Sequence, residues 1–309
     1  MKAKPFIKWV GGKTQLIEQL EALLPTDFDK WENVTYIEPF VGGGAMLFYM
    51  LQTHSNITKA VINDINPDLT MCYQVVRDKP DQLIKELKVI QAEYYALPTT
   101  EERLTYYLQK REEYNTKQLA PVRNTALFFF LNRTCFNGLY RVNKKGLFNV
   151  SFGKQDKPMI CDPTTIYADS ELLKKVTICT GDYQQTITNA QGKTLFYFDP
   201  PYRPLNATSN FNNYAKEAFN DDAQIRLKQF CDNVNEKGFA FMLSNADCSG
   251  ANPNDTFFED LYLSNPRYNM QRVYASRNIN SVASKRGKLT EIVVRNYEAN
   301  KKTNLSLFE

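Results

Sequence analysis

The chain has 309 residues, of which 43% are hydrophobic, and a formal net charge of +4 at pH 7. This size and composition are typical of a globular protein with one large domain and a smaller one. Because no apolar run reaches the roughly 18 residues of a membrane span and the N-terminal segment has no signal-peptide core, we expect a cytoplasmic protein without membrane contacts.

Short runs of β-branched and aromatic residues alternate with helical patterns along most of the chain. The expected strands are 34–40, 59–64, 176–180, 195–199, 239–244, 272–275 and 291–297. The expected helices between them are 14–24, 44–52, 67–77 and 222–236, and residues 300–309 are expected to form a frayed tail. The alternation predicts a Rossmann-like, doubly wound α/β fold with a mostly parallel sheet.

The pattern changes between about residue 78 and residue 160. Two long polar helices, "DQLIKELKVIQAEYYAL" and "TEERLTYYLQKREEY", precede the apolar "TALFFFLNRT", and strand patterns are absent. This change predicts a mainly helical domain, 78–160, inserted into a domain made of 1–77 and 161–309.

Positive charge is concentrated in three segments. Residues 1–14 contain four lysines and no acid, and residues 132–154 contain five Lys or Arg and no acid. Residues 272–295 contain six Lys or Arg and one acid, Glu291. If the segments converge, they would bind a polyanion. On charge alone, three solvated loops that never meet are an equally good interpretation.

Two motifs lie at expected strand ends, where doubly wound sheets bind ligands. In "EPFVGGGAMLF", Gly42, Gly43 and Gly44 let the backbone turn tightly and approach a ligand, although glycines also form ordinary turns. Asp64 in "VINDIN" can accept both hydroxyls of a ribose or cap the next helix. Their spacing favours an adenosine cofactor. Leu47 replaces the third glycine of G-x-G-x-x-G, so a dinucleotide is not specifically indicated.

The third motif, "DPPY" at 199–202, follows an apolar strand. Two prolines stiffen the backbone beside Asp199 and remove N–H donors, so the turn presents acceptors next to the Tyr202 ring. This edge suits an exocyclic amino group, whose hydrogens are drawn to the Asp199 carboxylate and the Pro200 carbonyl while Tyr202 stacks on the ring. For these four residues alone, a turn that only closes a strand is the alternative.

Other chemistries find little support in the sequence. Six cysteines form no C-x-x-C pair, so no metal site is expected. The sole histidine, His54, lies at an expected helix end, where capping or a solvated position is expected rather than a Ser-His-Asp triad.

Together these motifs resemble the Dam-type DNA adenine N6-methyltransferases, which use S-adenosylmethionine. The order matches over nearly the whole chain: "PFIKWVGGK", "IEPFVGGGA", "INDIN", "NRTCFNGLYRVNKKGLFNVSFG", "GDY", "DPPY" and "SKRGKLTEIVVRNY". The chain is most similar to members from restriction-modification systems that recognise GATC. The resemblance implies a class I methyltransferase fold with a DNA-recognition insertion, S-adenosylhomocysteine as product, no metal, double-stranded DNA as partner, and a functional pairing with a cognate restriction endonuclease in a bacterial or phage setting.

The resemblance also implies roles for individual residues. The cofactor would be surrounded by Trp9, Lys13, Phe40, Gly42, Gly43, Asp64, Asp182 and Asp199. The catalytic residues that take a flipped adenine would be Asp199, Pro200 and Tyr202. The DNA-binding residues would be Lys8, Phe136, Asn137, Leu139, Arg141 and Ser151.

Within the last group, Phe136 and Asn137 resemble residues that wedge into the duplex, and Lys8, Leu139 and Arg141 resemble base-contacting positions. Arginine can bind guanine N7 and O6, although a plain phosphate contact is the alternative for Arg141. Ser151 departs from the family, which usually has proline after "FNV". Its hydroxyl tolerates several bases, so specificity for GATC would be relaxed at one position.

Two other interpretations remain open. An RNA or protein-glutamine methyltransferase would share the cofactor fold, but the basic helical insertion favours a duplex partner. A DNA-binding regulator with an inactive site would conserve the fold without the chemistry, but the intact "DPPY" and "FVGGG" argue against it. The polar loop "RPLNATSNFNNY", 203–214, is expected to close over the substrate.

Overall fold

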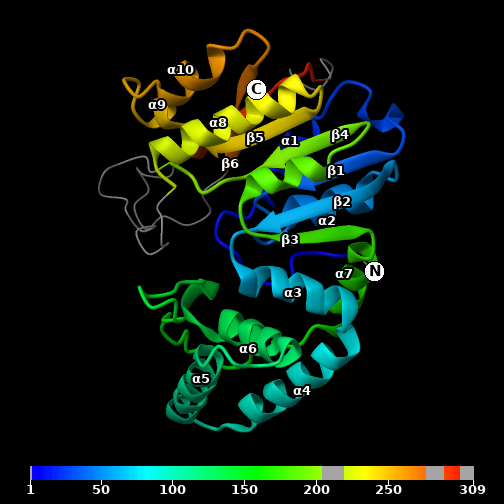
Figure 1. Ribbon diagram of the computed structural model, residues 1–309. Coiled ribbons are helices and arrows are strands. Elements are labelled where there is room, and N and C mark those ends of the chain that lie inside the picture. The colour runs from blue at the N-terminus through cyan, green and yellow to red at the C-terminus, as the bar shows by residue number, and fades with distance from the viewer. Residues whose placement is uncertain (1, 204–218, 276–288, 300–309) are drawn as a thin grey trace.

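The computed structural model describes residues 2–203, 219–275 and 289–299. In this part of the chain, seven strands form one sheet in the order β3-β2-β1-β4-β5-β7-β6 (Figure 1). The strands are β1 Val34–Glu38, β2 Ile57–Asp64, β3 Val176–Thr180, β4 Thr194–Phe198, β5 Ala240–Ala246, β6 Asn269–Ala275 and β7 Leu289–Arg295. Strands β3, β2, β1, β4 and β5 pair in parallel, and β7 is antiparallel to β5 and β6. The predicted α/β fold is confirmed. Each predicted strand is present, β3 with the predicted bounds and the other six with shifted ends.

The two central strands, β1 and β4, are buried along their whole length. Successive residues face opposite sides of the sheet, so Tyr36 and Tyr197 join one core while Ile37 and Phe196 join the other. Continuous apolar runs of this kind are typical of strands covered on both faces. The first core includes residues of α2 (Ala45–Thr53), α3 (Pro67–Asp78) and α7 (Pro163–Leu173), and the second includes residues of α8 (Asp221–Glu236) and α10 (Phe257–Leu263).

Most helices predicted to flank the sheet agree with the structure, since 44–52, 67–77 and 222–236 correspond to α2, α3 and α8. The helix predicted at 14–24 is shorter, α1 Ile17–Glu21. Leu16 at its N-cap offers no side-chain acceptor, and Pro25 disfavours helical geometry just before it. Helices α7 and α10 and the short α9 (Cys248–Ala251) were not predicted.

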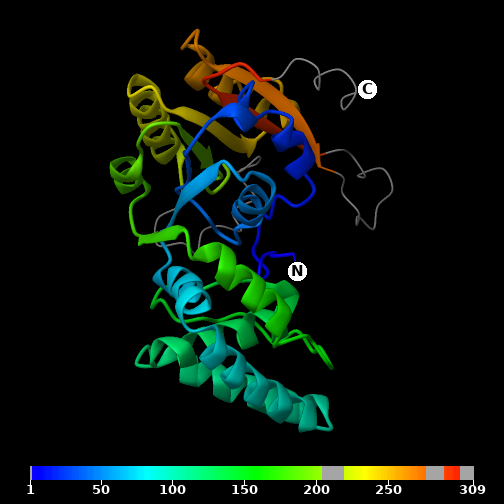
Figure 2. The same ribbon diagram turned by 90° about the vertical axis from the view of Figure 1, so that its right-hand side faces the viewer.

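A helical region lies beyond α3, at the end of the molecule opposite α8 and α10 (Figures 1 and 2). It contains α4 Pro80–Ala96, α5 Thr100–Asn115 and α6 Pro121–Thr134. The apolar α6 is largely buried and packs against α3, α4 and α5. No helix among the described residues is both long and apolar enough to cross a bilayer.

The order of the sheet places two chemically important loops side by side. Strands β1 and β4 are neighbours, with Thr35 paired to Thr194 and Ile37 to Phe196, although β2, the helical region and β3 separate them in sequence. Loops that follow such neighbours diverge at a topological switch point, where doubly wound sheets bind ligands. The loops that begin after β1 and after β4 therefore leave the same edge of the sheet.

Some predicted features lie outside the described residues. They are most of the expected lid at 203–214, most of the third basic segment, and the expected tail at 300–309.

Candidate active site

The glycine loop after β1 is shaped by Trp9. Gly42 and Gly44 have φ values of +49° and +73°, in the left-handed region that favours glycine. A Cβ on Gly42 would lie 2.8 Å from Cδ1 of Trp9, and a Cβ on Gly43 would lie 3.0 Å from its Cβ. A Cβ on Gly44 would meet the hydroxyl of Tyr73 at 2.5 Å. The loop therefore requires glycine, and two residues expected to hold the cofactor, Trp9 and Gly42, are in contact.

Asp64 ends β2 beside this loop. Its carboxylate accepts hydrogen bonds from the backbone N–H groups of Gly42 at 3.2 Å and Asn66 at 2.9 Å. Burial raises the pKa of Asp64, and these N–H groups oppose that shift. The alternative in which Asp64 caps the next helix is wrong, because the Asn66 side chain caps α3 by accepting from the N–H groups of Asp68 and Leu69.

Asn63 ties the loops after β1 and β3 together. Its Nδ2 donates to the carbonyl of Pro39 at 3.1 Å and to that of Gly181 at 2.9 Å. These bonds bring the neighbouring Phe40 and Asp182, both predicted to surround the cofactor, to the same edge of the sheet. Asn63 was not among the predicted site residues. The available signal was a polar residue inside an apolar strand.

Lys13 lies at the centre of a second group of residues. Its side chain is 4% exposed, and its Nζ lies 2.8 Å from Oδ1 of Asp199 and 3.9 Å from Oε2 of Glu291. The same Nζ lies 4.6 Å from the centroid of the Tyr202 ring, and the Tyr202 hydroxyl donates to Glu291 Oε2 at 2.5 Å. Burial raises the pKa of Asp199, and the ammonium of Lys13 opposes the shift. Segments far apart in sequence thus form one ion-paired cluster. Glu291 was not among the predicted site residues.

The Asp199 carboxylate is not sealed inside the protein, because 21% of the side chain is exposed. Pro200, which follows it, is buried. The expectation that the carbonyls of the D-P-P-Y turn remain free is wrong at Pro201, whose carbonyl accepts from Gln224 Nε2 at 3.2 Å. The amino-group site expected at Asp199 and Pro200 does not depend on that carbonyl.

A second carboxyl group, that of Glu38, lies next to this cluster and was also missed. It ends β1, is 2% exposed, and accepts a 2.6 Å hydrogen bond from the Tyr36 hydroxyl. Burial raises the pKa of Glu38 to about 8, and the charge of Asp199 adds to the shift. The two carboxyl groups are therefore close enough for the charge of Asp199 to raise the pKa of Glu38.

The residues predicted to contact DNA meet around one loop that follows α6. Buried Asn132 exchanges hydrogen bonds with the backbone of Lys8 and donates to the Gly138 carbonyl at 2.9 Å. The approach is close, because a Cβ on Gly138 would lie 2.4 Å from Cδ of Lys8. The first two basic segments, 1–14 and 132–154, therefore converge, so the alternative in which no two basic segments meet is wrong.

The exposed part of this loop carries the predicted wedge. Phe136 is 56% exposed, its neighbour Asn137 is exposed with a φ of +55°, and the Phe136 N–H donates to the Ser151 carbonyl at 2.8 Å. Leu139 is half-buried. Arg141 is exposed and donates from Nε to Asn149 Oδ1 at 2.8 Å.

Trp9 connects this loop to the glycine loop. Its ring stacks on those of Tyr140 and Phe128, with 5.5 Å and 6.5 Å between centroids, and it also contacts Gly42 and Gly43. One side chain thus contacts both the glycine loop and Tyr140, which lies between two residues predicted to bind DNA, Leu139 and Arg141. Within the described ranges, no cluster of His, Cys, Asp and Glu is arranged to hold a metal ion.

The family model for D12 class N6 adenine-specific DNA methyltransferases matches residues 9–279 of the chain. The chain belongs to this family. A type II methyltransferase of Methanocaldococcus jannaschii, M.MjaIII, is 43% identical over 300 residues, which cover 96% of this chain and 100% of the relative. M1.LlaDCHI of Lactococcus lactis, another type II methyltransferase, is 37% identical with 95% of each chain covered. A DNA adenine methylase of Vibrio cholerae is 34% identical over 80% of this chain and 82% of its own.

Membership in the D12 family confirms the resemblance predicted from the motifs. It gives the activity as adenine N6 methylation of DNA and implies S-adenosylmethionine as the cofactor. The family's substrate is DNA adenine rather than RNA or protein glutamine. The mixed sheet with flanking helices agrees with the class I methyltransferase fold expected for it.

Proposed function

We propose that this D12 enzyme methylates the adenine of GATC in double-stranded DNA, after that adenine has rotated out of the helix into the Asp199 site. The observation that carries the proposal is the cluster in which Lys13 and Glu291 fix Asp199 and Tyr202 beside the glycine loop. A partly exposed acceptor next to an aromatic ring is the complement of an adenine amino group and its ring.

The residues of the glycine loop and its surroundings fit an adenosine cofactor. Gly42 and Gly43 leave no space for a side chain near Trp9, so the backbone itself lines the site. Asp64 is held by two backbone N–H groups, and each of its oxygens keeps a second lone pair for a ribose hydroxyl. We assign cofactor contacts to these residues together with Lys13, Phe40, Asp182 and Asp199.

A cofactor bound at Asp182 would have to share its carboxylate with two groups of the protein. Asp182 accepts from the backbone N–H of Gln184 at 2.9 Å and pairs with Arg226 at 2.8 Å, while half of its side chain is exposed. Exposed pairs of this kind contribute about 0–1 kcal/mol, so a ligand donor can compete for Asp182 at small cost.

Bound S-adenosylmethionine supplies a methyl group that is open to nucleophilic attack. The protein's part is to orient the adenine nitrogen. Asp199 and the Pro200 carbonyl accept its two hydrogens, so its lone pair faces away from them, and Tyr202 stacks on the ring. Lys13 keeps positive charge next to Asp199, which favours the ionised acceptor. Asp199 acts as an orienting acceptor, and the methyl transfer needs no covalent intermediate with the enzyme.

The adenine must leave the duplex to reach such a site, which costs a few kcal/mol in lost pairing and stacking. Phe136 and Asn137 stand exposed on the loop and are suited to fill the gap that remains. Ser151 and Leu139 form backbone hydrogen bonds with Phe136, and Lys8 packs on the neighbouring Gly138. We assign these three residues and Arg141 to reading the flanking bases. Residues 78–160 would then be the target-recognition domain, with 1–77 and 161–309 the catalytic domain.

A restriction-modification role is supported by two relatives that are named type II methyltransferases. We propose that the protein protects its sites from a cognate restriction endonuclease and works on DNA in the cytoplasm of a bacterial-type cell.

The decisive experiment is to express the protein in a host without adenine methylation and to sequence the host DNA with detection of modified bases. The proposal predicts N6-methyladenine at GATC on both strands. Methylation at other sequences would overturn the GATC assignment, and tolerance at one position would point to Ser151. Absence of methylation would favour the inactive regulator.

A further inference from the structure

Asp68 joins the cofactor side of the site to the helical region. It lies in the first turn of α3, whose cap is the Asn66 side chain. The Asn66 side chain accepts from the Asp68 N–H at 3.0 Å, and the Asn66 N–H donates to Asp64 Oδ1 at 2.9 Å. The backbone of Asp68 is therefore tied to the carboxylate assigned to the ribose.

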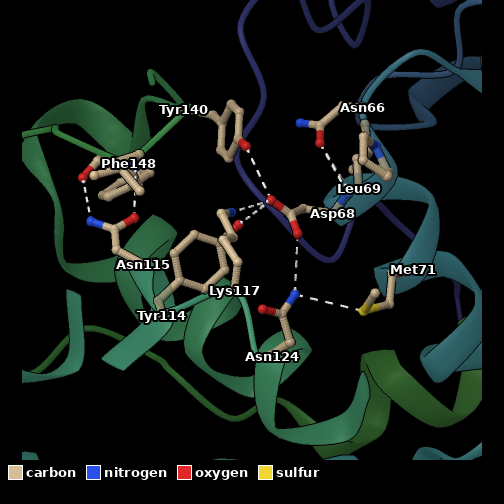
Figure 3. A network of polar contacts seen from close by, with 12 residues as sticks. Asn66, Asp68, Leu69, Met71, Tyr114, Asn115, Lys117, Asn124, Tyr140 and Phe148 are labelled. Carbon is tan, nitrogen blue, oxygen red and sulfur yellow. Dashed lines mark hydrogen bonds and ion pairs between the residues drawn. The ribbon is translucent and has the colours of Figure 1, made fainter. Parts of the chain in front are cut away.

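The Asp68 carboxylate points toward the helical region and the loop that follows α6 (Figure 3). Its Oδ2 accepts from the Tyr114 hydroxyl and the Lys117 ammonium, both at 2.7 Å, and from the Tyr140 hydroxyl at 3.4 Å. Its Oδ1 accepts from Asn124 Nδ2 at 3.3 Å. The side chain is 16% exposed. Burial raises the pKa of Asp68, but Lys117 and Tyr114 outweigh it and hold the pKa below its ordinary value. Asp68 is thus a charged, largely buried acceptor.

Among these partners of Asp68, Tyr140 belongs to the loop that follows α6, where it lies between Leu139 and Arg141. Its ring stacks on Trp9 at 5.5 Å, and Trp9 contacts Gly42. Two routes therefore connect the cofactor edge to Tyr140, a polar one through Asp68 and an aromatic one through Trp9. Both routes end at the residue that precedes Arg141 in the sequence.

We propose that Asp68 is a positioning residue that acts through Tyr140. It would couple cofactor binding to the placement of the loop that follows α6, to which we assign base reading. The inference rests on the proposed function of the two sites. Coupling of this kind is reciprocal, so the cofactor tightens binding of the cognate DNA and the cognate DNA tightens cofactor binding by the same factor. A role limited to holding α3 against α5 and α6 would change stability without changing that factor.

Tyr140→Phe and Tyr114→Phe form a matched pair, because each removes one hydroxyl that donates to the same oxygen of Asp68. Tyr114 lies in α5, outside the loop, and its hydrogen bond is the shorter one. The measurement is the Kd of S-adenosylhomocysteine by calorimetry, with and without a saturating DNA duplex. This duplex contains the recognition sequence at which the wild-type enzyme methylates adenine. The Kd of that duplex and of a scrambled duplex is also measured with and without S-adenosylhomocysteine, and thermal unfolding is followed for every variant.

For the wild-type enzyme we expect a coupling factor in the usual range of about 5- to 150-fold. Tyr140→Phe loses the polar route but keeps the ring that stacks on Trp9, so it should lower the factor several-fold with a small change in Tm. Tyr114→Phe should lower the Tm more and keep the wild-type factor. In an Asp68→Ala background, Tyr140→Phe should have no further effect on the factor, because the pair acts as one unit.

Wild-type coupling in Tyr140→Phe, or equal losses in the two phenylalanine variants, would overturn the inference. Failure of the proposed function looks different. A wild-type enzyme that methylates another sequence only changes the duplex used as the probe. One that methylates no duplex refutes the function and this inference before any variant is compared.

Discussion

The hydroxyl of Tyr202 donates a 2.5 Å hydrogen bond to the carboxylate of Glu291, which lies in β7 at the far end of the sequence. Glu291 is 7% exposed and also lies 3.9 Å from the ammonium of Lys13. The last strand thus fixes the ring that we assign to stacking on adenine.

Replacement of Glu291 tests this relationship. Glu291→Ala should release the Tyr202 ring and lower kcat by about 10- to 100-fold, since a hydrogen bond to a charged group contributes about 1.5–3 kcal/mol. Glu291→Gln, which keeps an acceptor, should retain more activity. Steady-state kinetics and S-adenosylhomocysteine affinity check this, and Asp232→Ala, which removes the acceptor of the Tyr268 hydroxyl, is the control. Wild-type kcat in Glu291→Ala would refute the role.

The fit of the glycine loop to Trp9 predicts a specific effect of Gly42→Ala. The new Cβ would lie 2.8 Å from the Trp9 ring, so the loop must shift, and cofactor affinity should fall by about 10-fold or more. Gly192→Ala is the matched control, because Gly192 has a similar φ of +56° but no atom within 4 Å of the position that a Cβ would take. Calorimetry with S-adenosylhomocysteine separates the two variants. Equal losses of affinity would show that backbone strain alone is responsible.

Phe136 is expected to fill the gap left by the extruded adenine. A duplex with 2-aminopurine at the target position should become more fluorescent when the wild-type enzyme binds, and Phe136→Ala should lose most of that increase. Its Tm should remain unchanged, since Phe136 is 56% exposed. Leu104→Ala, at an exposed apolar residue of α5, is the control and should behave as the wild type. An undiminished fluorescence increase in Phe136→Ala would remove the wedge from the mechanism.

His54 predicts how stability depends on pH. It is the C-cap residue of α2 and 4% exposed, so the solvated position considered from sequence is wrong. Burial lowers its pKa, but hydrogen bonds with Glu21 and Asp29 outweigh that effect and raise it above 6.5. The stabilisation of the folded protein by protonated His54 is therefore fully present below pH 6.5. It is lost as the pH rises through the raised pKa of His54.

The measurement is the free energy of unfolding in urea for the wild-type protein and His54→Gln, between about pH 5.5 and about pH 8.5. The difference between them should shrink as the pH rises. A difference that stays constant or grows would contradict the ion pairs.

Local patterns in the sequence predict the sheet and the positions of two site motifs. The apolar run before Asp199 defines β4, the glycines after β1 predict a tight turn, and their place at strand ends puts both at one edge of a doubly wound sheet. These features depend on the side chains of a few consecutive residues, so they are readable without knowing the fold.

Features that depend on distant partners were not predictable in the same way. Glu291 is the only acid in a basic segment, and nothing near it in the sequence indicates that Tyr202 and Lys13 are its partners. Glu38 belongs to the motif "IEPFVGGGA", but its raised pKa results from burial and from the charge of the distant Asp199. Asp68 had the appearance of an ordinary first-turn acid of a helix.

The central claim is that Asp199 orients the adenine nitrogen, and its most direct test is single-turnover methyl transfer by Asp199→Ala to a GATC duplex. Asp199→Asn is the second variant, because it keeps the size of the side chain beside the buried Lys13 ammonium. S-adenosylhomocysteine and duplex affinities should stay within a few-fold of the wild type, while the transfer rate should fall at least about 1000-fold in Asp199→Ala. Methyl transfer at the wild-type rate in Asp199→Ala would contradict the account.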